Sequence, residues 1–357
     1  TDHRLQQQQQ QQQQHLEQRQ KLRFMTGSWI GNTWVPPPPW RLYSANELLE
    51  FYRDKNVVIV GDSLARRFFA TFYYILRKAS EIEIFESDES HVPINDTTTN
   101  ESNVPNNIPF SYVEDQQKMD ANSVELRPKC TDPNVLNAFR RTPDKCLEMP
   151  GGGGGKLILI HPVYCTYHMT QFFQGESTLL QERRNRNRNM TTIETEQPQR
   201  RLSFADVVLV SNGAWDEGFS GKCDPGRTKI RSLVDEMESY QRLVSSNNET
   251  TQVVYRTAGY FDGGSQRSNS TIIDTMNTNT MDFIDEYRRN DTTTTILDGD
   301  DQTIINNYNN KLTYVNWGGA VSARSHKGER IRGDHVAHYG LEPRLVLLQM
   351  MTNRLME

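Results

Sequence analysis

The sequence lacks three features that mark common classes of protein. It contains no run of about 18 consecutive apolar residues, so no segment is expected to span a bilayer. Its 4 cysteines form no Cys-x-x-Cys pair, which argues against a zinc or thiol-redox motif, and we expect neither a metal nor another cofactor. The net charge of −5 is modest and gives no reason to expect nucleic acid or an anionic membrane as a partner.

Several low-complexity stretches reduce the length of chain that can fold. Residues 1–23 contain the glutamine run Gln6–Gln14 and are expected to lie outside the fold. Residues 24–357 are expected to form one domain. Surface loop insertions are predicted at about residues 86–125, 147–156, 174–202 and 289–303. The basic run Arg183–Arg188 falls in the third of these, where a solvated loop is the favoured interpretation.

The cysteines and glycosylation motifs bear on the compartment. The cysteines are either reduced core thiols or two disulfides, and Cys130 with Cys146 is the best candidate pair because the two bracket a polar loop. Asn-x-Ser/Thr motifs occur in predicted loops at Asn95, Asn100, Asn189, Asn248, Asn269 and Asn290. These features favour the secretory pathway. Because the chain begins with Thr, we expect a trimmed or processed form, from which a signal peptide or a membrane anchor could have been removed.

Short apolar runs recur between the insertions. They are Val57–Val60, Leu157–Ile160, Val207–Val210, Val253–Tyr255 and Leu312–Val315. None alternates cleanly with polar residues, which is typical of strands buried on both faces of a parallel sheet. Helices are predicted over residues 64–78, 227–244, 272–288 and 341–356. The order β-α-β-β-α-β-α-β-α predicts a doubly wound, three-layer α/β/α domain.

Gly61-Asp62-Ser63 follows the first apolar run, and ligand sites in open parallel sheets form where the strands end. Gly61 would permit a sharp turn, and Ser63 would then lie in the first turn of a helix, where its amide and the helix dipole favour developing negative charge. This suits a nucleophilic serine. The alternative is an ordinary helix cap. The segment lacks the further glycines of a dinucleotide-binding fingerprint, so that site is disfavoured.

Two later strand ends also carry polar residues. Asn212 and Gly213 follow the third run, where an amide side chain could donate to an oxyanion, and the alternative is an Asn-Gly turn. Trp215 is either a pocket wall or part of the core. Arg256, after the fourth run, would either bind an anionic group or form a buried structural pair.

Asp334, His335 and His338 lie together just before the last predicted helix. A serine hydrolase needs an imidazole base and a carboxylate that orients it, and this loop could supply both. The alternatives are a helix cap with two surface histidines, or a metal site, which is disfavoured because no third ligand is evident.

Taken together, these segments resemble the SGNH/GDSL hydrolase superfamily. "VVIVGDSLARR" with the late "DHVAHYG" is similar to its PC-esterase branch, which includes the trichome-birefringence-like proteins and the sialic-acid O-acetyltransferase domain. The upstream "GSW" resembles that branch's Gly-x-Trp segment, "NGAWD" its Asn-x-Gly-x-Trp block and "HYGLEPRLVLLQMM" its terminal helix. The resemblance spans about residues 26–350 and implies a flavodoxin-like, SGNH-type sheet.

The resemblance implies that Ser63 is the nucleophile, that His338 is the base, and that the Ser63 amide and Asn212 belong to the oxyanion hole. The branch places its acid three residues before the His; here that position is His335, and Asp334 lies four before His338. Either the loop is re-spaced or His335 has taken a role.

The expected function is therefore acyl-ester chemistry on glycans, as an O-acyltransferase or a carbohydrate esterase acting through an acyl-serine. Arg66, Arg67, Trp215 and Arg256 are candidate substrate contacts, with a solvated helix face as the alternative for Arg66 and Arg67. The expected partners are a glycan or other acyl ester and, for a transferase, an acetyl donor, in the Golgi lumen or outside the cell. A non-catalytic glycan-binding or scaffold protein on a degenerate SGNH fold is the alternative.

Overall fold

The fold was examined in a computed structural model of the chain. It describes residues 25–30, 33–88, 129–161, 163, 165–189, 203–211, 223, 230–245, 251–259, 270–290, 312–322 and 341–357. Within these residues, every helix is too short or too polar to cross a lipid bilayer.

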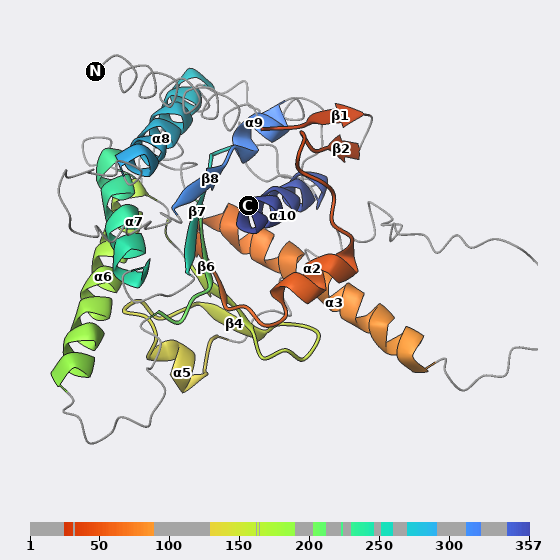
Figure 1. The fold of residues 1–357 in the computed structure, drawn as a ribbon, viewed down its shortest axis with the longest axis horizontal. Coiled ribbons are helices and arrows are strands. Elements are labelled where there is room, and N and C mark those ends of the chain that lie inside the picture. Colours follow the sequence, from red (N-terminus) through yellow and green to blue (C-terminus); the bar gives the residue numbers. More distant parts are fainter. Residues whose placement is uncertain are drawn as a thin grey trace, which may run out of the picture.

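The described strands form a mixed sheet and a small ribbon (Figure 1). Their bounds are β1 (Ser28–Ile30), β2 (Thr33–Val35), β3 (Val57–Gly61), β4 (Lys145–Glu148), β5 (Lys156–Ile160), β6 (Val207–Ser211), β7 (Gln252–Arg256) and β8 (Thr313–Val315). The six-stranded sheet has the order β4-β5-β3-β6-β7-β8, and β1 pairs with β2 separately. All neighbours in the large sheet run parallel except β4, which is antiparallel to β5. The parallel strands follow the flavodoxin-like order, in which the first strand lies between the second and the third.

The described helices cover both faces of this sheet. They are α2 (Ala45–Tyr52), α3 (Ser63–Asp88), α5 (Pro133–Leu136), α6 (Thr166–Asn189), α7 (Ile230–Ser245), α8 (Ser270–Asn290), α9 (Trp317–Val321) and α10 (Leu341–Met356). In Figure 1, α6, α7 and α8 lie on one side of the strands, and α2, α3 and α10 lie on the other. The α/β class and the layered arrangement are therefore confirmed.

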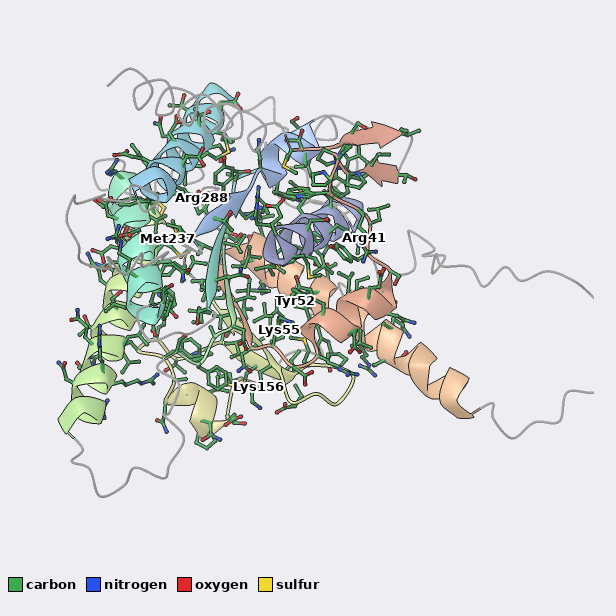
Figure 2. All side chains as sticks on the ribbon, in the orientation of Figure 1. Arg41, Tyr52, Lys55, Lys156, Met237 and Arg288 are labelled. Carbon is green, nitrogen blue, oxygen red and sulfur yellow. A yellow bond between two sulfur atoms is a disulfide. The ribbon has the colours of Figure 1, made fainter. Side chains whose placement is uncertain are left out.

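The core divides into two clusters because successive residues of a strand point to opposite faces. Val57 and Ile59 of β3 join a cluster with the apolar faces of α2, α3, α9 and α10. Val58 and Val60 join a second cluster with α5, α6, α7 and α8. Figure 2 shows Tyr52 and Met237 in these separate layers. The uninterrupted apolar runs are thus explained by strands that are buried on both faces.

The second half of α6 corrects the sequence analysis. Residues 174–189 were predicted to be a loop insertion, but they continue the helix that begins at Thr166. Few apolar residues of this part of α6 face the core, and Glu176, whose exposed fraction is 4%, is buried among them. A polar residue on the buried face weakens the periodic signal on which helix prediction depends.

The segment 147–156 also differs from the predicted insertion. Residues up to Glu148 belong to β4, and Lys156 begins β5, so the glycine-rich residues between them connect an antiparallel pair. The sequence analysis did not identify β4, because its four residues are only partly buried and include Lys145 and Glu148.

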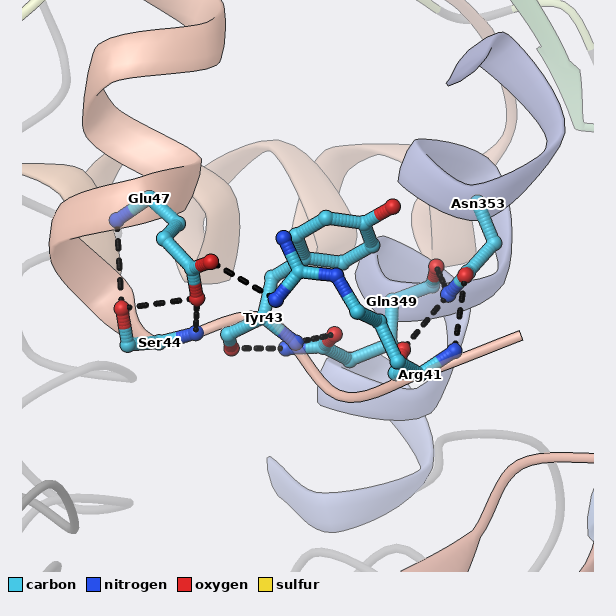
Figure 3. A network of polar contacts seen from close by, with 6 residues as sticks. All are labelled: Arg41, Tyr43, Ser44, Glu47, Gln349 and Asn353. Atoms are coloured by element: carbon cyan, nitrogen blue, oxygen red, sulfur yellow. Dashed lines mark hydrogen bonds and ion pairs between the residues drawn. The ribbon is translucent and has the colours of Figure 1, made fainter. Parts of the chain in front are cut away.

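The segment before α2 binds along α10 (Figure 3). The Arg41 amide donates to Asn353 Oδ1 at 3.0 Å, and Asn353 Nδ2 donates back to the Arg41 carbonyl at 2.8 Å. Gln349 makes the same reciprocal pair with the backbone of Tyr43, both bonds at 2.8 Å. The side chains of Ser44 and Glu47 then cap the start of α2. Residues 41–44 and helix α10 therefore pack against each other through paired backbone and side-chain hydrogen bonds.

Candidate functional site

Four neighbouring strands end in polar or flexible residues at one edge of the sheet. Gly61 of β3 pairs in register with Ser211 of β6, and Ser211 pairs with Arg256 of β7. On the other side of β3, strand β5 ends at Ile160, which pairs in register with Val60. His161 is the next residue of the chain. The carboxyl ends of parallel strands form the usual ligand-binding edge of such a sheet.

Gly61 occupies a position that has no room for a side chain. A Cβ atom there would lie 2.3 Å from the Ser211 carbonyl oxygen and 2.9 Å from Ala65 Cβ. The Gly61 carbonyl also accepts a hydrogen bond from the Val163 amide at 2.9 Å. The glycine therefore permits β6 and α3 to approach the end of β3 closely.

We expect Gly61→Ala to lower the free energy of unfolding by about 2–3 kcal/mol, because the added methyl group meets a sheet carbonyl and a helix side chain that cannot both move away. Urea denaturation measures this change. The control is Gly175→Ala in α6, whose Cβ would meet Arg140 Cβ at 3.7 Å, an ordinary contact, and which should be neutral or up to about 1 kcal/mol stabilising. Equal stability of Gly61→Ala and wild type would contradict the close approach.

Asp62 fixes the first turn of α3. It is fully buried, and its Oδ1 accepts hydrogen bonds from the amides of Leu64 at 2.9 Å and Ala65 at 3.4 Å. Burial raises the pKa of Asp62, while the Arg256 guanidinium and these amides oppose the rise. Asp62 is therefore the helix cap that the sequence suggested. Ser63 is the first residue of α3 and is half-buried.

Arg256 lies in the protein interior. It is 1% exposed, and its guanidinium carbon lies 4.5 Å from the centre of the Trp317 ring. Its charge acts on Asp62, two strands away across the sheet. Of the two roles considered for Arg256, this geometry favours a buried electrostatic pair over a substrate contact.

The other predicted site residues fall into two groups. Arg66 is exposed on α3, while Arg67 is half-buried and its carbonyl accepts a hydrogen bond from Arg344 Nη1 at 3.3 Å. The remaining ones lie outside the described residues: Asn212, Gly213, Trp215, Asp334, His335 and His338. The described residues contain no cluster of His, Cys, Asp or Glu that could hold a metal ion.

Both disulfides are formed, which settles one alternative left open by the sequence. Cys130 bonds to Cys146, as predicted, and Cys165 bonds to Cys223. Cys165 directly precedes α6, and Cys223 follows β6 in the chain. The second disulfide therefore ties the segment after β6 to the start of α6.

His161 lies at the carboxyl end of β5, beside the candidate site, and was not among the predicted site residues. It follows the apolar run Leu157–Ile160 directly, so the rule that identified Ser63 and Arg256 would also have found it. It is half-buried, and burial together with the charge of Arg66 lowers its pKa to about 4. Its imidazole is therefore neutral at physiological pH.

Glu176 is a second ionisable group that the analysis missed. Its carboxylate accepts a hydrogen bond from the Arg140 amide at 2.9 Å, and the Arg141 amide also bonds to it. Burial raises the pKa of Glu176 to about 7 despite these bonds. Glu176 thereby anchors the part of the Cys130–Cys146 disulfide loop that leads into β4.

This raised pKa predicts a pH-dependent stability. The pKa of Glu176 is about 7 when folded against an ordinary value of 4.5, so its stabilising contribution is complete below pH 4.5 and is lost as the pH rises towards 7. We expect that loss to be about 3 kcal/mol, and Glu176→Gln to remove it. Urea denaturation of both proteins at about pH 5 and pH 8 measures the difference. The pKa of His161 shifts in the opposite direction but is common to both proteins. Identical pH profiles would contradict the prediction.

No protein-family model, curated protein or solved structure matches this chain.

Proposed function

We propose that the protein carries out acyl-ester chemistry on glycans through an acyl-serine at Ser63, on an SGNH-type fold. The observation that carries the proposal is the position of Ser63, which opens a 26-residue helix directly after a buried inner strand. Asp62 holds the amides of that first turn, and Ser63 lies at the ligand-binding edge of the sheet.

The positions of the neighbouring described residues support the assignment of the catalytic partners. Asn212 follows Ser211, which pairs with Gly61 beside the nucleophile. The loop that contains Asp334 and His338 joins α9 to α10. The two helices that flank this loop are in contact, since Trp317 Nε1 at the start of α9 donates to the Pro343 carbonyl near the start of α10 at 2.7 Å.

The start of α10 also contacts the helix of the nucleophile. Arg344 donates to the Arg67 carbonyl, about one helical turn beyond Ser63. His338 lies three residues before Leu341, a span of at most about 10 Å of extended chain. The proposal requires the imidazole of His338 to lie within hydrogen-bonding distance of the Ser63 hydroxyl.

In this proposal, His338 removes the hydroxyl proton of Ser63 as its oxygen attacks the ester carbonyl, and Asp334 orients the imidazole and stabilises its charged form. The Ser63 amide and Asn212, with Gly213 beside it, donate to the oxyanion. The leaving sugar oxygen takes the proton from His338. In the second step His338 takes a proton from water or a second sugar hydroxyl, whose oxygen attacks the acyl-serine and accepts the acyl group, and the proton passes to the Ser63 oxygen as the acyl-serine bond breaks. Hydrolase and transferase differ only in that last acceptor.

The two disulfides and the six glycosylation motifs support a location in the secretory pathway, because disulfides persist in oxidising compartments. We place the proposed reaction in the Golgi lumen or outside the cell.

A fluorophosphonate probe tests for the nucleophile, because it forms a covalent bond with activated serines. We expect labelling of wild type and none of Ser63→Ala. Incubation of an acetylated donor with oligosaccharides then separates acetyl transfer from release of free acetate. If wild type remains unlabelled, a glycan-binding protein on a degenerate fold is favoured. The four-residue spacing between Asp334 and His338 is the observation that motivates this second candidate.

A further inference from the structure

A group of cationic side chains lies beside Ser63 at the edge of the sheet. It consists of Arg66, Arg141 and Lys145, whose charges all act on His161, and is named here the cationic cluster. Arg66 is exposed on α3, three residues beyond Ser63. Arg141, Lys145 and His161 are each half-buried.

The strand pairing brings these residues together. Val60 of β3 pairs with Ile160 of β5, so His161 continues β5 next to the Gly61-Asp62-Ser63 turn. Lys145 of β4 pairs with Leu159, and the Asp144 amide donates to the Leu159 carbonyl at 2.8 Å. The segment that contains Arg141 and Lys145 therefore runs antiparallel past the end of β5.

The charges around His161 have a clear excess of one sign. Arg66, Arg141 and Lys145 all act to lower its pKa, while the Asp144 carboxylate acts to raise it. The whole chain carries a net charge of −5, so this local positive excess does not reflect a generally basic surface. In addition, Arg66 lies near the start of α3, where a cation is electrostatically unfavourable, so the stability of the helix does not explain its position.

We propose that the cationic cluster is a subsite for an anionic oxygen group, either the carboxylate of an acidic sugar or the phosphate of an acyl donor. Guanidinium and ammonium groups bind such oxygens through charge-assisted hydrogen bonds. The assignment of the anion to the substrate or donor of Ser63 rests on the proposed function. The prediction that the cationic cluster binds an anion does not.

The backbone around the cluster is already fixed before an anion binds. Glu176 accepts hydrogen bonds from the amides of Arg140 and Arg141, and the disulfide at Cys146 anchors the strand that begins with Lys145. A preformed site loses less conformational entropy on binding.

The test is equilibrium binding to the intact chain by calorimetry, which needs no turnover. The probes are methyl glucuronoside, its uncharged methyl ester, and inorganic phosphate. We expect both anions to bind, the ester to bind at least about tenfold more weakly than the acid, and added salt to weaken anion binding. Tighter binding of the uronate assigns the anion to the glycan, and tighter binding of phosphate assigns it to the acyl donor.

Variants locate the site. Arg66→Gln and Lys145→Gln should each weaken anion binding about tenfold. Lys78→Gln is the matched control, since Lys78 lies on the same helix and pairs with Glu81. Anion binding should also raise the pKa of His161, measured by NMR, because the added negative charge favours the imidazolium. Equal binding of acid and ester, or unchanged binding by both variants, would overturn the proposal.

This test separates the two proposals. Anion binding without fluorophosphonate labelling would contradict the proposed acyl chemistry and support the anion subsite. Labelling of Ser63 without anion binding would support the proposed acyl chemistry and contradict the anion subsite.

Discussion

Ser63→Ala is expected to lower the turnover of acetyl esters roughly a thousandfold or more, because removing a catalytic serine leaves only the contribution of the oxyanion hole and substrate binding. The measurement is kcat/KM for 4-nitrophenyl acetate and for an acetylated oligosaccharide. The loss should appear in kcat, since the hydroxyl acts in the chemical step and contributes little to ground-state binding.

Ser80→Ala is the matched control for this substitution. Ser80 lies on the same helix, and its hydroxyl bonds only locally, to the Arg77 carbonyl at 2.8 Å. We expect its activity to equal that of wild type. Turnover by Ser63→Ala within tenfold of wild type would exclude an acyl-serine at this position.

Arg256→Met is expected to lower the free energy of unfolding by about 3 kcal/mol, because it removes both the positive charge that favours the ionised form of buried Asp62 and the contact with the Trp317 ring. Asp62 is fully buried and holds the amides that begin α3, so its ionisation is coupled to the first turn of that helix. Urea denaturation at neutral pH measures the effect.

Two further variants test this explanation. Adding Asp62→Asn to Arg256→Met should cost less than the sum of the two single changes, because the unpaired buried charge is then absent. Arg231→Met is the control, since Arg231 forms an exposed ion pair with Glu286 and should cost about 1 kcal/mol or less. Strict additivity of the Asp62 and Arg256 changes would show that the two groups do not interact.

The parallel strands of the sheet could be predicted from the sequence because they are buried on both faces. Their apolar runs are short and uninterrupted, and all five predicted runs form strands of the large sheet. The closing helix over residues 341–356 was also predicted, and it occurs with those bounds as α10. An uninterrupted apolar run is the sequence signal of a strand that is buried on both faces.

Two of the elements that the sequence analysis missed have polar groups on faces that are buried or partly buried. Helix α6 places Glu176 toward the core, and strand β4 is a half-buried edge strand with charged ends. Their positions depend on tertiary partners, namely the amides of residues 140–141 and the neighbouring strand β5, which periodicity cannot detect.

The sequence predicted where the candidate site lies in the fold better than it predicted the role of each residue there. The strand-end rule identified Ser63 and Arg256 but was not applied to His161. The burial of Arg256 depends on Trp317, some 60 residues later in the chain, and the pairing of Lys145 with Leu159 depends on a strand that was not foreseen. Long-range contacts of this kind are specified by the assembled fold and not by any local pattern.

The reciprocal bonds of Arg41 and Tyr43 with α10 have a consequence for how the chain is made. Arg41 finds its partner Asn353 across a separation of 312 residues. During synthesis, Arg41 leaves the ribosome long before Asn353, so part of the sheet face that α10 covers stays exposed until that helix emerges. Nascent chains that stall before α10 should therefore expose apolar surface and be held by chaperones.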